Sequence, residues 1–546
     1  MAAFDEPAAG AGAAPVSDYD VIIIGAGMSG IYQLYRLREL GVRVRVFESG
    51  TGVGGTWYWN RYPGARFDSE SYTYGYSFSG ELLEEWSWSE HFASQPETLR
   101  YLNHVVDKFD LRRDIRFRSR VTAAHYREEE RAWDVTLQDG SRHRTRFLIT
   151  AVGPLSAPTM PRIDGVGTFA GQAFHTARWP HEPVSFAGKR VAVIGTGATG
   201  VQTIQEVAKT AGHLTIFQRR PNWCAPLHNS RIDDETQRRI KAGYPEMFDR
   251  CRETFACFLH TPDPRGTFEV TAEEREAFFE KLYAEPGFGI WQGNFRDILI
   301  DRAANAAISE FVARKIRQRV KDPKVAEQLV PRDHGFGTRR VPLETGYYEV
   351  YNQPNVRLVD IKDTPIERIT RAGIRTSDAD YEFDIIIYAT GFDAITGSFD
   401  RIDIRGVDGL RLKDRWADGP QTFLGVQVAG FPNLLMLMGP HTALGNIPRS
   451  IEYNVEWVTG LIRHMRDRNL TRAEARPEAV AAWTEHVKAA GKGLLSNEVD
   501  SWMTGINSNV EGKHRRIIAR YSGSAPAYRA RANEVAANGY QEVMLT

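Results

Sequence analysis

Two glycine-rich turns in the sequence have the residue types and spacing that hold a dinucleotide. The first, Gly25-Ala26-Gly27-Met28-Ser29-Gly30, directly follows the β-branched run Tyr19–Ile24, which is typical of a parallel strand buried on both faces. The first glycine allows a tight turn, the second leaves space for a diphosphate, and the third lets the next helix pack closely. That helix, predicted to end near Leu40, offers free N–H groups and a positive dipole end to phosphates.

An acidic residue completes this first unit. A second predicted strand, residues 42–47, ends at Glu48, which lies 23 positions after Gly25. A carboxylate at this place holds the two ribose hydroxyls of an adenosine. A G-x-G-x-x-G pattern alone is weak evidence, but strand, turn, helix, second strand and acid together predict an adenine dinucleotide site.

The same unit recurs later in the chain with one informative change. A predicted strand, Arg190–Ile194, leads into Gly195-Thr196-Gly197-Ala198-Thr199-Gly200, and a second strand follows at residues 214–217. The position equivalent to Glu48 is Gln218, followed by Arg219 and Arg220. A carboxylate would repel a 2′-phosphate, whereas neutral Gln and two guanidiniums would accept one, at about 1.5–3 kcal/mol per charge-assisted hydrogen bond. The first unit is therefore predicted to bind FAD and the second NADPH; solvated surface arginines are the alternative.

A third motif lies between the two units. Residues 169–180 read FAGQAFHTARWP and match the pattern F-x-G-x-x-x-H-x-x-x-W-P. In this motif the sequence resembles the type I Baeyer–Villiger monooxygenases, and its ending, Trp179-Pro180, differs from that of related N- and S-oxygenating flavoproteins. The resemblance covers nearly the whole chain from about residue 18, including residues 54–68, and is closest to phenylacetone, steroid and large-ring ketone monooxygenases.

The resemblance implies a reaction and the residues that perform it. NADPH would reduce FAD, O2 would add to give a flavin C4a-peroxide, and ketones would become esters or lactones, with sulfoxidation as a second activity. Such a reaction needs a fixed cation beside an anionic peroxide and then a second anion. Arg340 matches the family's catalytic arginine, Asp68 the acid that orients it, and Arg339 a position that helps bind the 2′-phosphate. Without the resemblance, Arg339-Arg340 would be interpreted as a basic pair on the surface.

The resemblance also assigns a role to His175 and to several aromatic residues. His175 is expected on the linker between the two nucleotide domains, where it affects how the NADPH domain moves without acting as an acid or base. Trp57, Trp59 and Tyr74 are predicted to contact the flavin, with core packing as the alternative. Trp502 matches a tryptophan that reaches the nicotinamide ribose, with packing on a mobile loop as the alternative.

The complete prediction comprises two catalytic residues, two cofactor-binding sets and no metal site. The catalytic residues are Arg340 and Asp68. The FAD set is Gly25, Gly27, Met28, Ser29, Gly30, Glu48, Gly55, Thr56, Trp57, Tyr58, Trp59, Asp68, Tyr74, Val121 and Ile447. The NADP set is Arg66, Thr196, Gly197, Ala198, Thr199, Gly200, Gln202, Arg219, Arg220, Arg339, Arg340 and Trp502.

Positioning these residues requires an α/β fold with two Rossmann-like dinucleotide-binding domains, one for FAD and one for NADPH. Residues 148–153 and 387–391 are similar strands ending in small residues, and they are predicted to mark where the chain crosses between domains. A helical insert is expected because Thr271 to Glu274 form a capping box and apolar residues from Ile308 to Val320 share one helix face. The predicted boundaries are a disordered tail at 1–17, an FAD domain at 18–153 and 389–546, an NADPH domain at 154–227 and 333–388, and the insert at 228–332.

Composition excludes several classes of partner. The 546 residues include 69 basic and 69 acidic side chains, so net charge gives no reason to expect nucleic acid or an anionic membrane as a partner. No apolar run approaches the roughly 20 residues of a membrane helix, and the first 17 residues do not resemble a secretory signal. Three cysteines without a Cys-x-x-Cys pair argue against a zinc site and suit a reducing compartment. We therefore expect a cytoplasmic enzyme, monomeric or weakly dimeric.

Three other functions were weighed against this one. A disulfide reductase shares the two-nucleotide layout but needs a redox-active cysteine pair, which is absent here. An N- or S-oxygenating flavin monooxygenase is the main alternative, and a non-catalytic nucleotide sensor is a remote one. One departure from the phenylacetone-type enzyme concerns residues 441–447, which are two residues shorter than the matching segment beside the flavin. This shorter segment argues against a strict preference for aryl ketones.

Overall fold

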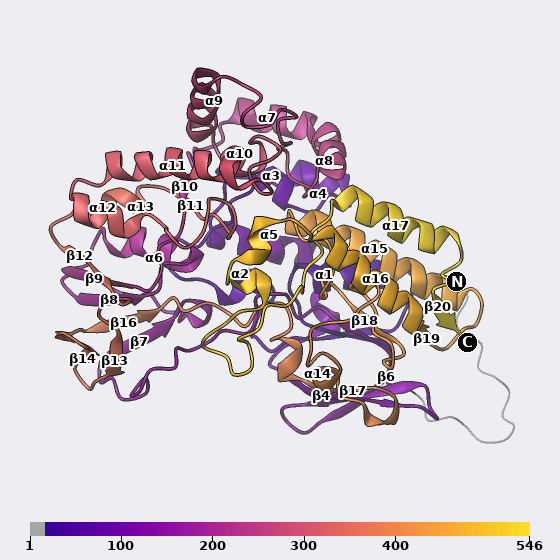
Figure 1. Cartoon of the computed structure of the whole chain (residues 1–546). Coiled ribbons are helices and arrows are strands. Elements are labelled where there is room, and N and C mark those ends of the chain that lie inside the picture. The colour runs from indigo at the N-terminus through magenta and orange to yellow at the C-terminus, as the bar shows by residue number, and fades with distance from the viewer. Residues whose placement is uncertain (1–16) are drawn as a thin grey trace, which may run out of the picture.

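The computed structural model describes residues 17–546, so the predicted tail lies outside the described residues except at residue 17. The molecule contains two large sheets, and in each sheet one glycine-rich turn follows an inner strand. The two sheets form the right and left parts of the molecule in Figure 1, and a helical region lies across the top. The α/β fold with two nucleotide-binding units is the one that the sequence predicts.

The first sheet is built around the strand that precedes Gly25. Its strands in spatial order are β17 (Asp403–Arg405), β4 (Val121–Arg127), β5 (Ala132–Leu137), β6 (Arg142–Thr150), β1 (Tyr19–Ile24), β2 (Val44–Phe47) and β3 (Ile115–Arg116), and β18 (Leu434–Met436) also pairs with β6. β1 runs parallel to both neighbours. Its alternate residues enter two different apolar clusters, so β1 is buried on both faces as predicted.

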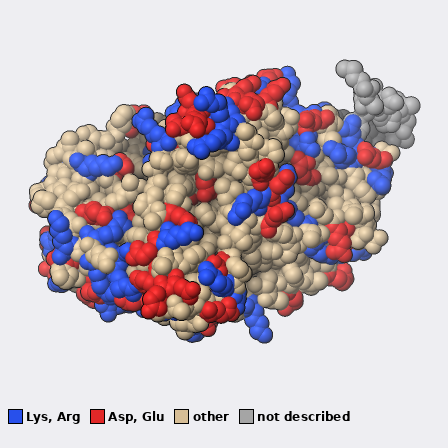
Figure 2. Space-filling view, turned by 90° about the horizontal axis from the view of Figure 1, so that it is seen from above, with Lys and Arg blue, Asp and Glu red and all other residues tan. Residues whose placement is uncertain are grey.

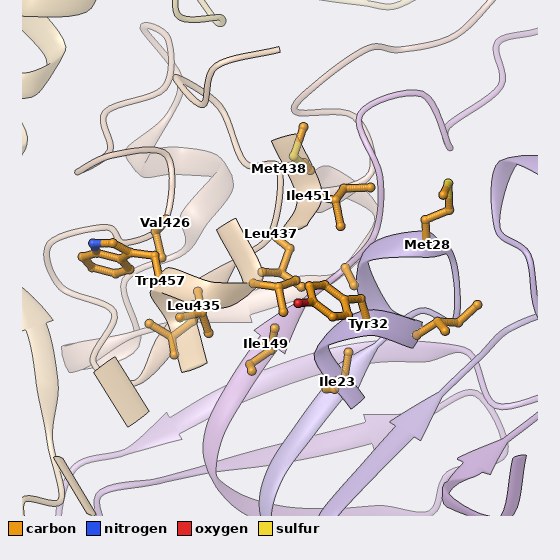
Figure 3. Close-up of a cluster of buried hydrophobic side chains, with 14 of the residues drawn as sticks. Ile23, Met28, Tyr32, Ile149, Val426, Leu435, Leu437, Met438, Ile451 and Trp457 are labelled. Carbon is orange, nitrogen blue, oxygen red and sulfur yellow. The ribbon is translucent and has the colours of Figure 1, made fainter. Parts of the chain in front are cut away.

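One face of this sheet is covered by helices from both ends of the chain. These are α1 (Met28–Glu39), α5 (Gln95–Lys108), α15 (Ile447–Arg466), α16 (Pro477–Ala490) and α17 (Ala525–Ala537). In Figure 3, Ile23 of β1 and Ile149 of β6 lie beneath Tyr32 of α1, and Leu435 of β18 lies to their left near Trp457 of α15. Figure 3 also shows Met28, Met438 and Ile451 near this cluster, and these three side chains line a cavity above it.

The second sheet has the same construction. Its strands in spatial order are β12 (Val356–Asp360), β9 (His213–Gln218), β8 (Arg190–Ile194), β16 (Ile385–Tyr388) and β7 (Gln172–His175), all parallel. The turn after β8 leads into α6 (Ala198–Val207). Ile24 of β1 pairs with Thr150 of β6, and Ile194 of β8 pairs with Tyr388 of β16, so each turn lies beside the end of a crossing strand.

Two crossings connect the sheets, and they lie side by side. After β6 the chain runs to β7 of the second sheet, and after β16 it returns to β17 of the first. The amide of Thr159 donates to the carbonyl of Gly391 at 3.0 Å, and the amide of Asp393 donates to the carbonyl of Ala157 at 2.7 Å. The two similar strands of the sequence therefore lead into two connecting segments that are hydrogen-bonded to each other between the sheets.

The insert is helical, as the sequence predicts. Its helices are α7 (Asp234–Ala242), α8 (Tyr244–Glu253), α9 (Ala272–Ala284), α10 (Gly289–Gln292), α11 (Arg302–Arg319) and α12 (Pro323–Leu329). α9 begins with the predicted Thr271–Glu274 capping box. Buried side chains of α9 and α11 share one apolar cluster with β8 and α6, so the insert packs on the second sheet.

The remaining short elements connect and cap these units. They are α2 (Thr56–Trp59), α3 (Ser71–Tyr74), α4 (Gly80–Glu85), β10 (Ala225–Pro226), β11 (Leu343–Glu344), α13 (Tyr347–Val350), β13 (Ile366–Ile369), β14 (Gly373–Thr376), β15 (Asp380–Glu382), α14 (Leu412–Arg415), β19 (Ala473–Ala475) and β20 (Val543–Leu545). β10 pairs with β11 where the chain enters and leaves the insert.

The surface agrees with the balanced composition. Figure 2 shows Lys and Arg intermixed with Asp and Glu over the visible face. Among the described residues, no helix is both long and apolar enough to cross a membrane.

Candidate active site

A cavity opens at the carboxyl end of β1, where the first glycine turn meets α1. Most of the residues predicted to bind FAD line this cavity, although they come from distant parts of the chain. They are Gly25, Gly27, Met28, Ser29, Glu48, Gly55, Thr56, Trp57, Trp59, Tyr74, Val121 and Ile447.

The backbone around the turn leaves no space for a side chain at Gly25, Gly30 or Gly55. Gly25 has φ +105°, and a Cβ there would lie 2.6 Å from the carbonyl oxygen of Ala151. A Cβ on Gly55 would lie 2.8 Å from the Cα of Gly27. Gly27 is the N-cap of α1 and provides no side-chain hydrogen bond to the helix. A narrow glycine turn before an uncapped helix fits the diphosphate of a dinucleotide.

Glu48 is held in place at the end of β2. Its side chain is buried and accepts hydrogen bonds from the backbone N–H groups of Ala26, at 2.8 Å, and Gly50, at 2.6 Å. These bonds fix the carboxylate on the wall of the cavity. The position fits the predicted contact with ribose hydroxyls.

Three residues of the predicted FAD set lie outside the cavity lining. Gly30 packs against the turn, because a Cβ there would lie 1.9 Å from the carbonyl oxygen of Gly25. The hydroxyl of Tyr58 accepts a hydrogen bond from the amide of Thr51 at 3.1 Å, and its ring packs beside His181. Asp68 pairs with an arginine of the second unit. Gly30 and Tyr58 thus support the turn.

The second glycine turn repeats the geometry of the first. A Cβ on Gly195 would lie 2.5 Å from the carbonyl oxygen of Ala389, and a Cβ on Gly200 would lie 2.2 Å from the carbonyl oxygen of Gly195. Gly197 is the N-cap of α6 and, like Gly27, makes no side-chain hydrogen bond. No protein atom lies within 4 Å of a Cβ built on Gly197. This turn also fits a diphosphate.

Three guanidiniums gather beside the second turn. Arg220 and Arg339 both lie near Asp333, at 3.5 Å and 3.7 Å. Burial lowers the pKa of Arg219, and Arg220 adds to this effect. Burial likewise lowers the pKa of Arg339, where Asp333 opposes the shift and Arg220 and Arg219 reinforce it. Arg220 and Arg339 share one carboxylate, and no salt bridge within the described residues offsets the charge of Arg219, so the cluster keeps a net positive charge that fits a phosphate.

Gln218 does not take part in this cluster as the sequence interpretation assumed. Its side chain is fully buried, and its Nε2 donates to the carbonyl of Gln328 at 2.8 Å. The contact comes from α12 of the insert. The residue that replaces the ribose acid therefore anchors the insert to β9.

The remaining residues of the predicted NADP set lie in two places. Gln202 of α6 accepts a hydrogen bond from Tyr62 at 2.7 Å and donates to the carbonyl of Arg66 at 3.0 Å, which joins α6 to the first unit. Arg66 itself lies 3.3 Å from Glu90. Trp502 begins a short helix, and the segment around it contacts the arginines: Arg339 donates to the carbonyl of Asp500 at 2.7 Å.

The predicted pair of Arg340 and Asp68 is present. An Nη1–Oδ2 distance of 2.6 Å joins the arginine, from the second unit, to the aspartate, from the first. The Asp68 side chain is fully buried, whereas that of Arg340 is 30% exposed. The guanidinium also lies 5.6 Å from the ring centroid of Phe288 in the insert. The arrangement holds one cation in a fixed orientation where both units and the insert meet.

His175 joins the two crossings. Its Nδ1 accepts from the amide of Ala177 at 3.0 Å, so Nε2 carries the proton and donates to the carbonyl of Thr159, at 3.3 Å. The hydroxyl of Thr390, from the other crossing, also lies 3.3 Å from Nε2. Burial lowers the pKa of His175 to about 4. A neutral, hydrogen-bonded imidazole in this place fits the predicted structural role.

Sequence reasoning missed three arginines that line the first cavity: Arg120, Arg178 and Arg401. Arg178 is part of the 169–180 motif, so its position in that motif was the one available signal. Arg120 and Arg401 belong to no motif. All three cysteines are free and buried, and no group of three or more potential metal ligands occurs within residues 17–546.

Known proteins with similar sequences share this organisation over their full length. Residues 18–246 match the flavin-binding monooxygenase-like family. The chain is 49% identical over 530 residues to 2-oxo-Delta(3)-4,5,5-trimethylcyclopentenylacetyl-CoA monooxygenase of Pseudomonas putida, covering 95% of this chain and 97% of that protein. It is 42% identical to cyclopentanone 1,2-monooxygenase of Comamonas sp. (strain NCIMB 9872), covering 95% of each. The chain belongs to the Baeyer–Villiger monooxygenases of this family.

Two further matches refine this membership. A crystal structure of OTEMO in complex with FAD and NADP superimposes with a TM-score of 0.94 at 48% identity, covering 97% of this chain and 100% of that one. Phenazine N-monooxygenase PhzNO1 of Lysobacter antibioticus is 40% identical, covering 96% of this chain and 97% of that protein. FAD and NADPH are the cofactors of this Baeyer–Villiger monooxygenase, and the predicted family, fold and enzyme class are confirmed.

Proposed function

We propose that the enzyme converts a ring ketone to a lactone and that Arg340, oriented by Asp68, is its catalytic residue. The Arg340–Asp68 ion pair carries this proposal, because it fixes a cation at the junction of both nucleotide units and the insert. When bound, FAD and NADPH supply the redox chemistry that activates O2.

The protein's own part in the reaction is to stabilise negative charge. Oxygen insertion next to a carbonyl places charge on the substrate oxygen, and a fixed guanidinium stabilises it without rearrangement. Asp68 forms an ion pair with Arg340 and accepts a hydrogen bond from the amide of Leu343, at 3.1 Å, so the acid is itself held in place. Asp68 is a positioning residue, since its bonds point to Arg340 and to the backbone.

The nucleotide sites divide between the two units. We assign FAD to the first cavity and the 2′-phosphate of NADPH to Arg219, Arg220 and Arg339, with Trp502 near the nicotinamide ribose. The domain boundaries proposed from the sequence, 18–153 with 389–546 and 154–227 with 333–388, are supported by sheet membership. A cytoplasmic location and a monomeric or weakly dimeric state also belong to the proposal.

The ring-ketone assignment is supported by relatives named for five-membered-ring substrates. The short segment at residues 441–447 bears on substrate size. Gly445 packs against the insert, where a Cβ would lie 2.0 Å from the carbonyl oxygen of Ala256, so backbone of the insert lies against this segment. We still expect bulky ketones to be accepted, because the shorter segment reaches less far beside the flavin.

A ketone panel tests the substrate class. Cyclopentanone, cyclohexanone, a cyclopentenone bearing an acyl-CoA side chain, a steroid ketone, phenylacetone and acetone would be incubated with NADPH and O2. We expect lactones from the ring ketones, detected by product mass and matched to NADPH consumed. Conversion of acetone alone, with no lactone from any ring ketone, would contradict the proposal.

A second candidate is N-oxygenation, which the similarity to a phenazine N-monooxygenase favours. The same panel should therefore include phenazine and a sulfide. An N-oxide formed faster than any lactone would make that activity the principal one.

A further inference from the structure

Three arginines line the FAD cavity from three separate segments. Arg120 precedes β4, Arg178 lies in the 169–180 motif, and Arg401 follows the return crossing. Each has an exposed side chain. In residues 17–546 none of the three forms an ion pair with a carboxylate, whereas Arg190, Arg220, Arg339 and Arg340 of the second unit do.

Arg178 is the most constrained of the three. Its guanidinium carbon lies 4.4 Å from the ring centroid of Trp59, which also lines the cavity. Nη1 donates to the carbonyl of Ala177 at 2.8 Å. Although Arg178 keeps part of its surface exposed, partial desolvation at the cavity wall lowers its pKa to about 10, and the charges of Arg120 and Arg401 add to this effect. The side chain is therefore fixed against the cavity by stacking and by its own backbone.

The charges of this arginine cluster favour an anion in the cavity. The three positive charges repel one another, and an anion bound between them offsets this repulsion because it attracts all three. Glu48 on the cavity wall already accepts two backbone hydrogen bonds, and Asp393, whose charge acts on Arg401, is paired with Lys513. The diphosphate of FAD carries the complementary charge, and the uncapped helix α1 opens on the same cavity.

We propose that Arg178, together with Arg120 and Arg401, binds the diphosphate of FAD and so ties the linker between the nucleotide units to flavin occupancy. The inference rests on FAD occupying the cavity of the first unit. Arg178 lies three residues after His175, which joins the two crossings. Arg401 lies on the return crossing and donates to the carbonyl of Pro158 on the outward one, at 2.8 Å. Flavin binding should therefore hold both crossings.

Such coupling must act in both directions. If bound FAD holds the crossings and thereby raises the affinity of the second unit for NADP+, then bound NADP+ must raise the affinity for FAD by the same factor. Arg178→Ala should weaken this coupling, since it removes the contact through which the linker reaches the flavin nucleotide.

The test measures release of FAD from the holoenzyme. Flavin fluorescence would be followed after dilution at several salt concentrations, with and without saturating NADP+. At low salt we expect Arg178→Ala to release FAD about 10-fold or more faster than the wild type. Its release rate should also depend less on salt concentration, and NADP+ should slow it less, than in the wild type. Arg178→Lys should recover part of the retention, because it keeps the charge but not the planar stack on Trp59.

The matched control is Arg162→Ala on the same linker. Arg162 is exposed and lies 3.4 Å from Glu511, outside the cavity. It should release FAD as the wild type does. Arg401→Ala provides a second variant with the same expected direction, should Arg178→Ala not fold.

The outcomes separate this inference from the assignments on which it rests. If the wild type cannot hold FAD, the assignment of the cavity fails. If it holds FAD and Arg178→Ala releases it at the wild-type rate, the arginine cluster does not bind the diphosphate. An acceleration by the same factor at every salt concentration would indicate packing on Trp59 alone and would also overturn the proposal.

Discussion

The two nucleotide units share one scaffold but differ in how much of their site the protein itself completes. In the first unit, a Cβ on Gly55 would collide with Gly27, and Glu48 is fixed by backbone hydrogen bonds. In the second, Gly197 faces open space and Gln218 is turned into the core. The backbone approaches Gly55 closely in the first site, whereas the space at Gly197 in the second site is open.

This difference suits the two cofactors. A flavin that remains bound through many turnovers benefits from a rigid, pre-formed site, whereas a nicotinamide cofactor must exchange. The arginines of the second unit are also contacted by the segment around Trp502 and by Ser508, whose hydroxyl accepts from Arg219 at 2.6 Å. The arginine cluster proposed to bind NADPH is therefore held in part by residues beyond 495.

The largest expected effect comes from breaking the ion pair that joins the two units. Arg340→Ala should keep its yellow colour and still be reduced by NADPH, because the arginine is proposed to stabilise charge during oxygenation. Removing one such stabiliser lowers the rate by about 10²–10³. Arg340→Lys should recover little, since it lacks the planar fork.

Ester or lactone yield per NADPH consumed, with flavin occupancy checked in the same sample, measures this effect. Arg332→Ala, which removes an exposed arginine 3.0 Å from Glu327, is the matched control. A near wild-type yield from Arg340→Ala would reduce the arginine to a nucleotide-binding surface residue.

One glycine substitution in each nucleotide site should affect the two units differently. Gly55→Ala forces a Cβ to 2.8 Å from Gly27 at φ +54°, so the protein should lose both stability and FAD even without NADPH. Gly197→Ala meets no protein atom within 4 Å, so the fold and the flavin should be unaffected. The methyl group would instead obstruct the nucleotide, and the KM for NADPH should rise by up to about 100-fold.

Thermal unfolding, flavin content and NADPH kinetics on both variants make this comparison. If Gly197→Ala lost FAD, or Gly55→Ala kept it with unchanged stability, the proposed difference between the units would be wrong.

The sequence predicted local features of these units and missed features that depend on tertiary contacts. The strand, turn and helix of each unit follow from short-range periodicity and glycine spacing, and β1 and β8 have the predicted bounds. The second strand of the first unit begins at Val44, later than the predicted residue 42, because apolar character alone does not define where pairing starts.

The misses concern residues whose partners lie far along the chain. Gln218 was interpreted from its place beside two arginines, but its neighbour in space is the carbonyl of Gln328 at the end of α12. Arg120 and Arg401 meet in one cavity only because the chain returns from the second sheet to the first. The pairing of Arg340 with Asp68 was available only through resemblance to a family, since no local pattern connects them.

The next effect concerns discrimination between the two nicotinamide cofactors. Arg219→Ala should raise the KM for NADPH by about 10–100-fold and leave that for NADH nearly unchanged, because only NADPH carries the 2′-phosphate. Arg368→Ala, at an exposed position outside the arginine cluster, is the control. Equal changes for both cofactors would mean that Arg219 supports the fold or the shared part of the nucleotide.

The smallest effect concerns the histidine that joins the two crossings. Burial lowers the pKa of His175 to about 4, whereas an unfolded histidine titrates near 6.5. Above pH 6.5 both states are neutral, so the folded protein keeps its full stability. As the pH falls from 6.5 towards 4, the unfolded chain binds a proton that the folded one does not, and up to about 3 kcal/mol of the free energy of unfolding is lost.

His175→Asn removes that titration, so the stability of the variant should fall less steeply across this window. The variant starts at a lower stability because the bonds to Thr159 and Thr390 are weakened. Urea unfolding at saturating FAD, measured from pH 7 to pH 4, gives the slopes, and His213→Asn at an exposed site is the control. Parallel slopes for His175→Asn and the wild type would show that this imidazole is already accessible to protons in the folded enzyme, and the crossings would then be looser than their hydrogen bonds indicate.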